Sequence, residues 1–300
     1  PGFPYLLGLP VSLHLPRRRT PRAAVPAGSV AMAGGQAGIY PFTSPGGWQV
    51  LGRTGLKLFD PAAQRCAMFK TGDRVRFVPV DRLEASEAAR PPDAVVGERW
   101  IQVISPGSLT TVQDLGRPGH EAAGVSPGGA VDREALQIAN LMVGNAPDAA
   151  VLEFCLNGAI FQSNVDTVIA LAGAVGKSRQ VTAGEVVDFS KPMVGVRACL
   201  AVAGGFIVPR VLGSAATDVR AGFGGFFGRF LKEGDRLAMG DAGSIPQCGD
   251  WFVGKSEKML EIELRFLAGV QGEWFSEKAR WRFRNEIYRV TPSADRIVRI

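Results

Sequence analysis

Short apolar runs alternate with glycine-rich turns over most of the chain. The runs SVAMAGG (29–35), TVIALAGA (167–174) and ACLAVAGG (198–205) each pass directly into glycine. Four to eight apolar residues bounded by turn residues are typical of buried strands. The pattern therefore predicts a mostly β protein.

A second pattern is a Gly-acid pair followed by alternating apolar positions. It occurs in TGDRVRFVPV (71–80), AGEVVDFS (183–190) and EGDRLAMG (233–240). A Gly-acid pair suits a tight turn, so we expect a strand to leave the turn in each segment. The repetition favours barrel-like β modules over a βαβ series.

One helix is well defined by its ends. Asp132 can cap the first N–H groups, and Gly144 can supply the left-handed residue after the last turn at Val143. The apolar face between them consists of Leu136, Ala139, Met142 and Val143.

A shorter helix is predicted after Ser276. We expect Ala279 and Phe283 to face inward from it.

Residues 81–98 differ from both flanks, because they are charged, rich in alanine and contain two prolines without a periodic apolar pattern. We interpret them as a linker between two domains, residues 1–80 and 99–300.

Composition limits the possible partners. The net charge is +6, but the basic residues are spread out except for RRRTPR (17–22). We interpret that run as a solvated loop, with an acidic small molecule as the next option, and expect no nucleic-acid partner. No apolar run approaches the ~20 residues of a membrane span, and no secretory signal opens the chain.

Cysteine and histidine are too few and too scattered for a metal site. The four cysteines include no C-x-x-C pair, and there are only two histidines. We expect no metal and a reducing, cytoplasmic location.

Three motifs invite stronger interpretations. GVSPG (124–128) matches a nucleophile elbow, but Pro127 has no N–H for an oxyanion hole. LAGAVGKS (171–178) resembles a phosphate loop, but Leu171 replaces its first glycine, so we expect a hairpin with an exposed Lys177. GFGGFFGR (222–229) fits either a loop over a pocket or a plain turn.

The region 104–145 concentrates polar residues suited to a site. Amide side chains together with a carboxylate and a guanidinium can bind an amide or carboxylate by paired hydrogen bonds. The candidates are Gln113, Asp114, Arg117, Ser126, Asp132, Asn140 and Asn145. Structural roles remain open for single members: Asp132 as a helix cap, Asn145 at the helix end, and Asp114 with Arg117 as a local ion pair.

The strings TTVQDLGRPG, GVSPGGAVD and ANLMVGN resemble the KipA-like family, also called allophanate hydrolase subunit 2 or the biotin-dependent carboxyltransferase family. PGFPYL (1–6), residues 16–54 and GDRVRFVPV (72–80) resemble the end of the KipI-like subunit. The chain thus resembles a KipI–KipA fusion that begins within the first part and stops before the last strands of the second. The resemblance implies cyclophilin-like β-barrels.

The same resemblance implies a function. We expect a 5-oxoprolinase-type subunit that opens a lactam with ATP, in a hetero-oligomer with a LamB/YcsF-like subunit. Gln113, Asp114 and Arg117 would act on the substrate, with Ser126, Asn140 and Asn145 around them. From the KipI-like part, Gln36, Tyr40, Trp48 and Arg53 are candidates for a wall between subunits.

Two alternatives remain open. One is carboxyl transfer to urea or a similar amide from biotin carried on a partner, and the other is a regulatory binding protein without chemistry. The sequence also departs from the family, which usually has Ser-Arg-Ser-Thr where Ser214, Ala215, Ala216 and Thr217 stand. Near the end, Ile297 and Val298 replace a usual Met-Gly pair.

Overall fold

The computed structural model describes residues 2–83, 97–173, 176–243, 250–251 and 265–286. Strands dominate these residues, which include two α-helices, so the expectation of a mostly β chain is confirmed. The chain divides into two compact units, residues 1–253 and 254–300. Most of the predicted linker lies outside the described residues.

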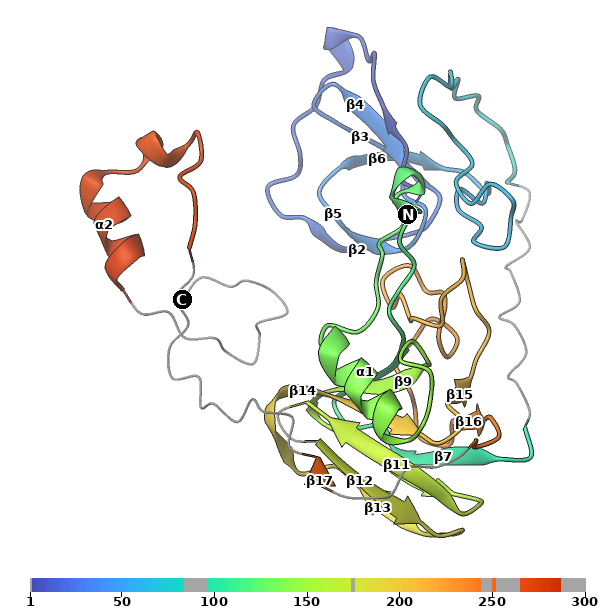
Figure 1. The fold of residues 1–300 in the computed structure, drawn as a ribbon. Helices are drawn as coiled ribbons and strands as arrows, with labels where there is room; N and C mark the ends of the chain where they lie inside the picture. The colour runs from blue at the N-terminus through green and yellow to red at the C-terminus, as the bar shows by residue number, and fades with distance from the viewer. Residues whose placement is uncertain (1, 84–96, 174–175, 244–249, 252–264, 287–300) are drawn as a thin grey trace. The chain divides into compact units, whose positions relative to one another are not determined.

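The first 83 residues form two small antiparallel sheets (Figure 1). Four strands pair in the order β1-β4-β3-β6, and β2 pairs with β5. The bounds are β1 Tyr5–Leu6, β2 Arg22–Val25, β3 Ser29–Ala33, β4 Gln36–Ile39, β5 Ser44–Gly46 and β6 Gln49–Arg53, with a short 3-10 helix η1 at Val11–Leu13.

Two larger sheets follow in residues 97–251. A five-stranded sheet has the order β13-β10-β7-β16-β15, and a six-stranded sheet has the order β17-β12-β11-β14-β9-β8. The bounds are β7 Trp100–Ser105, β8 Leu109–Gln113, β9 Val151–Asn157, β10 Ile160–Ser163, β11 Thr167–Ala172, β12 Gly176–Val181, β13 Val186–Asp188, β14 Pro192–Val202, β15 Phe206–Ile207, β16 Arg236–Met239 and β17 Asp250–Trp251, with a 3-10 helix η2 at Glu121–Ala123.

The side-chain alternation of the strands builds two cores. On β11, Ile169 lies in the cluster between the two sheets, together with Phe161 and Leu200. The intervening positions Val168 and Ala170 face the other way, into a second cluster with the helix α1. Successive side chains in a strand point to opposite faces, so one apolar run supplies both cores.

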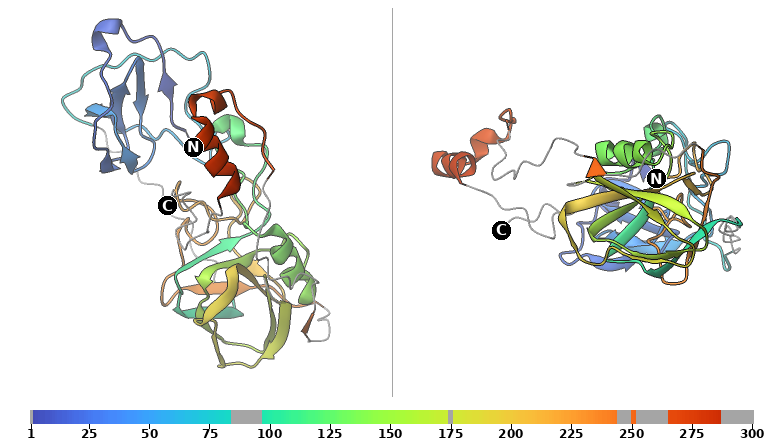
Figure 2. Two further views of the ribbon diagram at one scale, coloured as in Figure 1. Left: turned by 90° about the vertical axis from the view of Figure 1, so that its left-hand side faces the viewer. Right: turned by 60° about the horizontal axis from the view of Figure 1, so that its bottom comes forward.

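The helix α1 (Arg133–Met142) lies over this second face, as Figures 1 and 2 show. Asp132 caps it by accepting a hydrogen bond from Ala135 N at 2.9 Å. Gly144 follows the helix with φ 75°. The predicted ends and the predicted apolar face are confirmed, since Leu136, Ala139, Met142 and Val143 are all buried.

The helix α2 (Glu277–Asn285) begins after Ser276, as predicted, and Ser276 caps it. A 3-10 helix η3 (Gly272–Trp274) precedes it. The prediction that Ala279 and Phe283 face inward is wrong. Ala279 is exposed, and Phe283 is 59% exposed. Four of the nine residues of α2 are Lys or Arg, which leaves no apolar stripe wide enough to bury.

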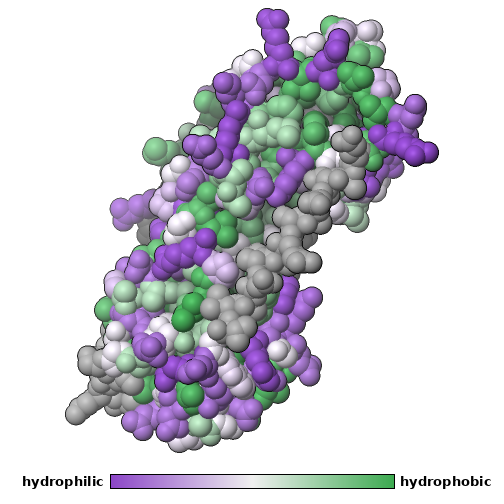
Figure 3. All heavy atoms as spheres, turned by 90° about the vertical axis from the view of Figure 1, so that its right-hand side faces the viewer, coloured by the Kyte–Doolittle hydropathy of each residue, from purple (hydrophilic) through white to green (hydrophobic). Residues whose placement is uncertain are grey.

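The Gly-acid segments behave differently from one another. AGEVVDFS contains β13 and EGDRLAMG contains β16, so two of the expected strands form. Residues 73–80 are not a strand, because no described strand pairs with them. The side chains of Phe77, Val78 and Val80 are exposed. Figure 3 shows hydrophobic and hydrophilic residues interspersed on one face of the surface.

The segment around Lys177 is the predicted hairpin. β11 and β12 pair antiparallel with Leu171 opposite Lys177, and Lys177 is exposed. The glycine-rich segment 222–229 is turn structure, and Phe223 and Phe226 are buried in it. Neither helix in the described part of the chain has the length and apolar character of a membrane span.

Candidate functional site

The strongest candidate site begins where β8 ends. Gln113 is the last residue of β8, and the chain then turns through Asp114, Gly116 and Arg117. Gln113, Asp114 and Arg117 are 7%, 3% and 2% exposed. The structure therefore brings these three predicted residues together inside the protein, against the segment 211–217.

Asp114 is fully occupied by hydrogen bonds. One carboxylate oxygen accepts from Ser214 Oγ at 2.6 Å and from Gly116 N at 2.7 Å. The other accepts from Ala215 N at 2.6 Å. The carboxylate thus fixes two backbone segments about a hundred residues apart in sequence.

Arg117 also contacts the segment 211–217. Nε donates to the carbonyl oxygen of Val211 at 3.3 Å, and Nη2 donates to that of Ala216. The guanidinium lies 4.9 Å from the centre of the Phe223 ring, a cation–π contact. Burial lowers the pKa of Arg117, while the nearby carboxylates of Asp114 and Asp218 oppose that shift.

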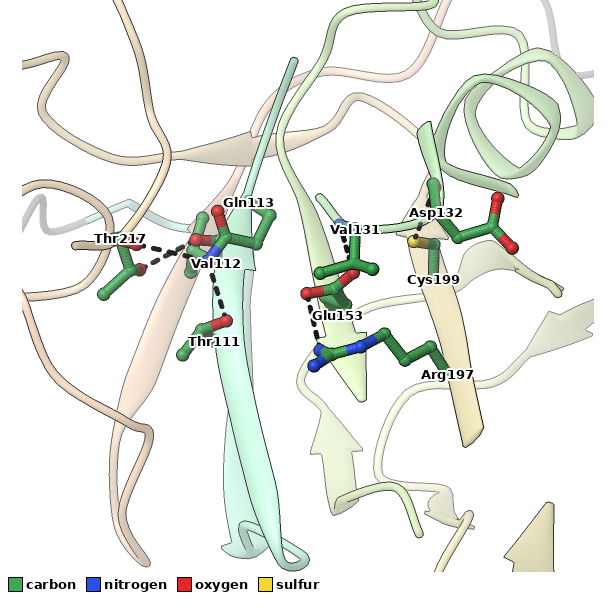
Figure 4. Close-up of polar contacts among 9 residues, drawn as sticks. All are labelled: Thr111, Val112, Gln113, Val131, Asp132, Glu153, Arg197, Cys199 and Thr217. Atoms are coloured by element: carbon green, nitrogen blue, oxygen red, sulfur yellow. Dashed lines mark hydrogen bonds and ion pairs between the residues drawn. The ribbon is translucent and has the colours of Figure 1, made fainter. Parts of the chain in front are cut away.

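Gln113 contacts the end of the same segment, and Figure 4 shows its hydrogen bonds together with those of Thr217. Its Nε2 donates to Thr111 Oγ1 at 2.9 Å and to the carbonyl oxygen of Thr217 at 3.3 Å. Thr217 Oγ1 donates in turn to the carbonyl oxygen of Val112 at 2.7 Å. The three candidates therefore hold the segment that carries the Ser-Ala-Ala-Thr departure.

Two polar atoms of this network have no partner. Gln113 Oε1, an acceptor, and Arg117 Nη1, a donor, are buried without a hydrogen bond among the described residues. Buried polar groups are nearly always paired, so each unpaired one needs an explanation. Gln113 Oε1 can accept a hydrogen bond from an N–H group, and Arg117 Nη1 can donate one to an oxygen.

Glycines shape the loop that faces Arg117. The backbone N–H of Arg117 donates to the carbonyl oxygen of Pro127 at 2.6 Å. A side chain at Gly128 would lie 3.5 Å from Arg117 Nη1. Ser126 is exposed on this loop, which no strand precedes and no helix directly follows. Ser126 is connected to the cluster by its neighbour Pro127, whose carbonyl oxygen accepts the hydrogen bond from Arg117 N.

Asn140 and Asn145 form a separate network at the end of α1. Asn140 Nδ2 donates to the carbonyl oxygen of Ala149 at 2.8 Å, and Asn145 Nδ2 donates to that of Val202 at 2.8 Å. Asn145 Oδ1 accepts from Gly204 N at 3.0 Å. Their hydrogen bonds connect the helix end to β14 and not to the loop of Gln113.

The four candidates of the first 83 residues have different environments. Tyr40 and Trp48 are 4% and 6% exposed and belong to a small aromatic core. Burial raises the pKa of Tyr40. Gln36 is half-buried on β4, and Arg53 is exposed, with Nε donating to the carbonyl oxygen of Ala27 at 3.1 Å.

Glu153 is a buried acidic residue outside the candidates predicted from the sequence. It lies on β9, 5% exposed, and accepts from Val131 N at 2.7 Å and Arg197 Nη1 at 3.2 Å (Figure 4). Burial raises its pKa, and the Val131 N–H and Arg197 partly oppose this. Burial likewise raises the pKa of the neighbouring Cys199. A single acid inside the apolar run VLEFCLN was the signal available in the sequence.

Comparison with protein families gives two matches. Residues 123–299 match the family described as carboxyltransferase domain, subdomain A and B. Residues 1–69 match the family described as carboxyltransferase domain, subdomain C and D.

Similar proteins carry the two parts separately. The chain is 42% identical over 152 residues to the C subunit of 5-oxoprolinase from Escherichia coli, covering 47% of this chain and 49% of that protein. It is 58% identical over 79 residues to the B subunit of 5-oxoprolinase, also from Escherichia coli, covering 26% of this chain and 36% of that protein. The chain thus spans about half of the first relative and about a third of the second.

A solved structure covers both parts in one chain. The crystal structure of TTHA0988 superposes with a TM-score of 0.74 at 35% identity, over 84% of this chain and 54% of that one. Because the subdomain A and B model matches more than half of its residues, the chain belongs to the carboxyltransferase-domain family, with a subdomain C and D segment fused in front.

Proposed function

We propose that the chain is part of an ATP-dependent 5-oxoprolinase-type amidohydrolase, which opens a cyclic amide to an amino acid. The observation that carries the proposal is the pair of unpaired buried atoms, Gln113 Oε1 and Arg117 Nη1. A lactam offers the complementary groups, an N–H donor and a carbonyl acceptor. The names of the similar 5-oxoprolinase proteins support the same reaction class.

The chemistry requires activation, because an unactivated amide resists water. ATP would transfer its terminal phosphoryl group to the carbonyl oxygen, and one water would add to the carbonyl carbon. The C–N bond would then break as the nitrogen takes a proton. A second water would release phosphate and leave the carboxylate, so the overall reaction consumes ATP and two waters.

Arg117, Gln113 and Asp114 would have different roles in the reaction. Arg117 Nη1 would donate to the oxygen on which charge develops, the contribution that electrostatic stabilisation makes in acyl chemistry. Gln113 Oε1 would accept the ring N–H and orient the amide. Asp114, whose oxygens already accept three hydrogen bonds, would act as a positioning residue.

Partners follow from the same proposal. The relatives are named as the C and B subunits of 5-oxoprolinase, which supports a hetero-oligomer. We propose that its further subunit is LamB/YcsF-like. The test is ATP hydrolysis by this chain with that subunit, measured with and without 5-oxoproline. Stimulation by 5-oxoproline is the expected result, and equal rates in both conditions would contradict the proposal.

The family description favours one second candidate. Both matching models are carboxyltransferase domains, which fits carboxyl transfer from biotin to urea or a similar amide. These 300 residues contain no Met-Lys-Met attachment motif, so biotin would be carried outside them, and we propose that a partner carries it. Urea-dependent consumption of a carboxylated biotin carrier, without stimulation by 5-oxoproline, would favour this candidate.

A further inference from the structure

All of the net charge of the chain comes from its first 59 residues. These hold six of the 34 Lys and Arg residues and none of the 28 Asp and Glu residues. The remaining residues hold 28 of each sign. Surfaces that only need solubility usually mix both signs, so a segment without any acid points to an anionic ligand.

The charge gathers in the arginine loop, which we define as residues 17–22. Arg17, Arg18 and Arg19 are exposed, and none has an ion-pair partner among the described residues. Arg22 completes the loop and is half-buried. Three adjacent guanidinium groups without carboxylate partners can contact several phosphate oxygens of one ligand.

The backbone of the arginine loop is held in place from three directions. Arg18 N donates to the carbonyl oxygen of Gly47 at 2.8 Å. Gln49 Nε2 donates to that of Pro16 at 3.0 Å, and Arg22 Nη1 donates to that of Trp48 at 2.9 Å. A loop fixed before binding loses less conformational entropy when a ligand arrives.

Aromatic rings lie beside these charges. The guanidinium of Arg17 is 6.0 Å from the centre of the Trp48 ring, and the Tyr5 ring is also 6.0 Å from that ring. Phe3 supports Tyr5 from 4.7 Å, while 64% of Tyr5 remains exposed. An exposed, supported aromatic ring is a stacking platform for a flat base.

We propose that the arginine loop and Tyr5 form a binding site for a nucleoside triphosphate, with the phosphates on Arg17–Arg19 and the base on Tyr5. The choice of a nucleoside triphosphate over other polyanions rests on the proposed function, which uses ATP. The site would place ATP on the subdomain C and D segment.

The test is calorimetric titration of the whole chain with ATP, inorganic tripolyphosphate and AMP. The main variant carries Arg17→Ser, Arg18→Ser and Arg19→Ser, which leaves the three backbone anchors intact. Its matched control carries Arg74→Ser, Arg76→Ser and Arg82→Ser, which removes the same charge from other positions outside the arginine loop.

We expect ATP and tripolyphosphate to bind the wild-type chain more tightly than AMP. The arginine-loop variant should bind both at least about tenfold more weakly, while the control binds as the wild type does. Tyr5→Ser should weaken the binding of ATP but not the binding of tripolyphosphate, which has no base.

Two results would overturn the site. If ATP binding weakened equally in the arginine-loop variant and its control, the binding would depend on the overall positive charge of the protein and not on a site at the arginine loop. The second result is an arginine-loop variant that binds ATP as the wild type does but no longer binds the LamB/YcsF-like subunit. The arginine loop would then be a docking surface for that subunit.

The binding measurement separates this inference from the proposed function, because it needs no turnover. ATP binding at the loop without stimulation by 5-oxoproline would reject only the proposed function. Stimulated turnover with unchanged ATP affinity in the arginine-loop variant would reject only the site.

Discussion

At the residue scale, the ionised carboxylate of Glu153 is an expensive group to bury. Its two hydrogen bonds, to Val131 N and Arg197, compensate part of the cost. Burial nevertheless dominates and raises its pKa. The side chain connects β9, β14 and the start of α1, so its protonation is coupled to folding.

The raised pKa of Glu153 predicts the direction in which stability changes with pH. A folded pKa above the unfolded value contributes stability that is present below the unfolded pKa and is lost as pH rises through the folded pKa. We therefore expect the unfolding free energy of the wild type, relative to that of Glu153→Gln, to fall as pH rises through this window. Denaturant unfolding at a series of pH values measures it.

Glu185 supplies a control of opposite sign. Its pKa is lowered, chiefly by the hydrogen bond from Arg179. Its contribution is therefore present above the unfolded pKa and is lost as pH falls through the folded pKa. The Glu153 account fails if Glu153→Gln and Glu185→Gln change the pH profile in the same direction.

At the element scale, the segment 222–229 supports the candidate site through close backbone packing. Gly224 has φ 72°, and a Cβ there would lie 2.2 Å from the carbonyl oxygen of Ala216 and 2.7 Å from Arg117 Nη2. Gly222 has φ 73°, but nothing lies within 4 Å of its Cβ position. Comparing substitutions at Gly222 and Gly224 therefore distinguishes the cost of backbone strain from the cost of a steric contact.

We expect Gly224→Ala to lower the unfolding free energy by at least ~1 kcal/mol more than Gly222→Ala. Both substitutions place alanine at positive φ, but only the first must displace Ala216 and its hydrogen bond from Arg117. Thermal and denaturant unfolding of the two variants measures the difference. Equal losses would mean that the turn, and not the contact with Arg117, determines the cost.

The same elements show how far the sequence could predict the structure. Asp132 and Gly144 mark the ends of α1 by local chemistry, so a single sequence reveals them. The partners of Gln113 and Arg117 lie about a hundred residues away, and no local pattern encodes that contact. The strand expected at 73–80 failed for a similar reason, since a strand requires a partner that alternation alone cannot identify.

At the scale of the whole molecule, the chain joins a subdomain C and D segment to a subdomain A and B domain of the carboxyltransferase family. The buried amide-and-guanidinium network belongs to the second part, and the excess positive charge belongs to the first. We propose that one part holds the lactam and the other holds ATP. Joining them in one chain would keep both substrates on a single polypeptide.

The most direct test of this account is glutamate formation from 5-oxoproline and ATP by this chain with its LamB/YcsF-like subunit. Wild type is compared with Arg117→Ala and with the control Thr217→Val, which loosens the same segment but leaves Arg117 Nη1 and Gln113 Oε1 in place. The folded state of each variant is checked by thermal unfolding.

The account predicts that Arg117→Ala lowers the rate at least about a hundredfold, as expected for the loss of a donor to the developing charge. Thr217→Val should lower it less than about tenfold, because Val112 O keeps the N–H of Thr217 as a donor. Full activity of a folded Arg117→Ala chain would contradict the proposed role of Arg117 in binding the lactam.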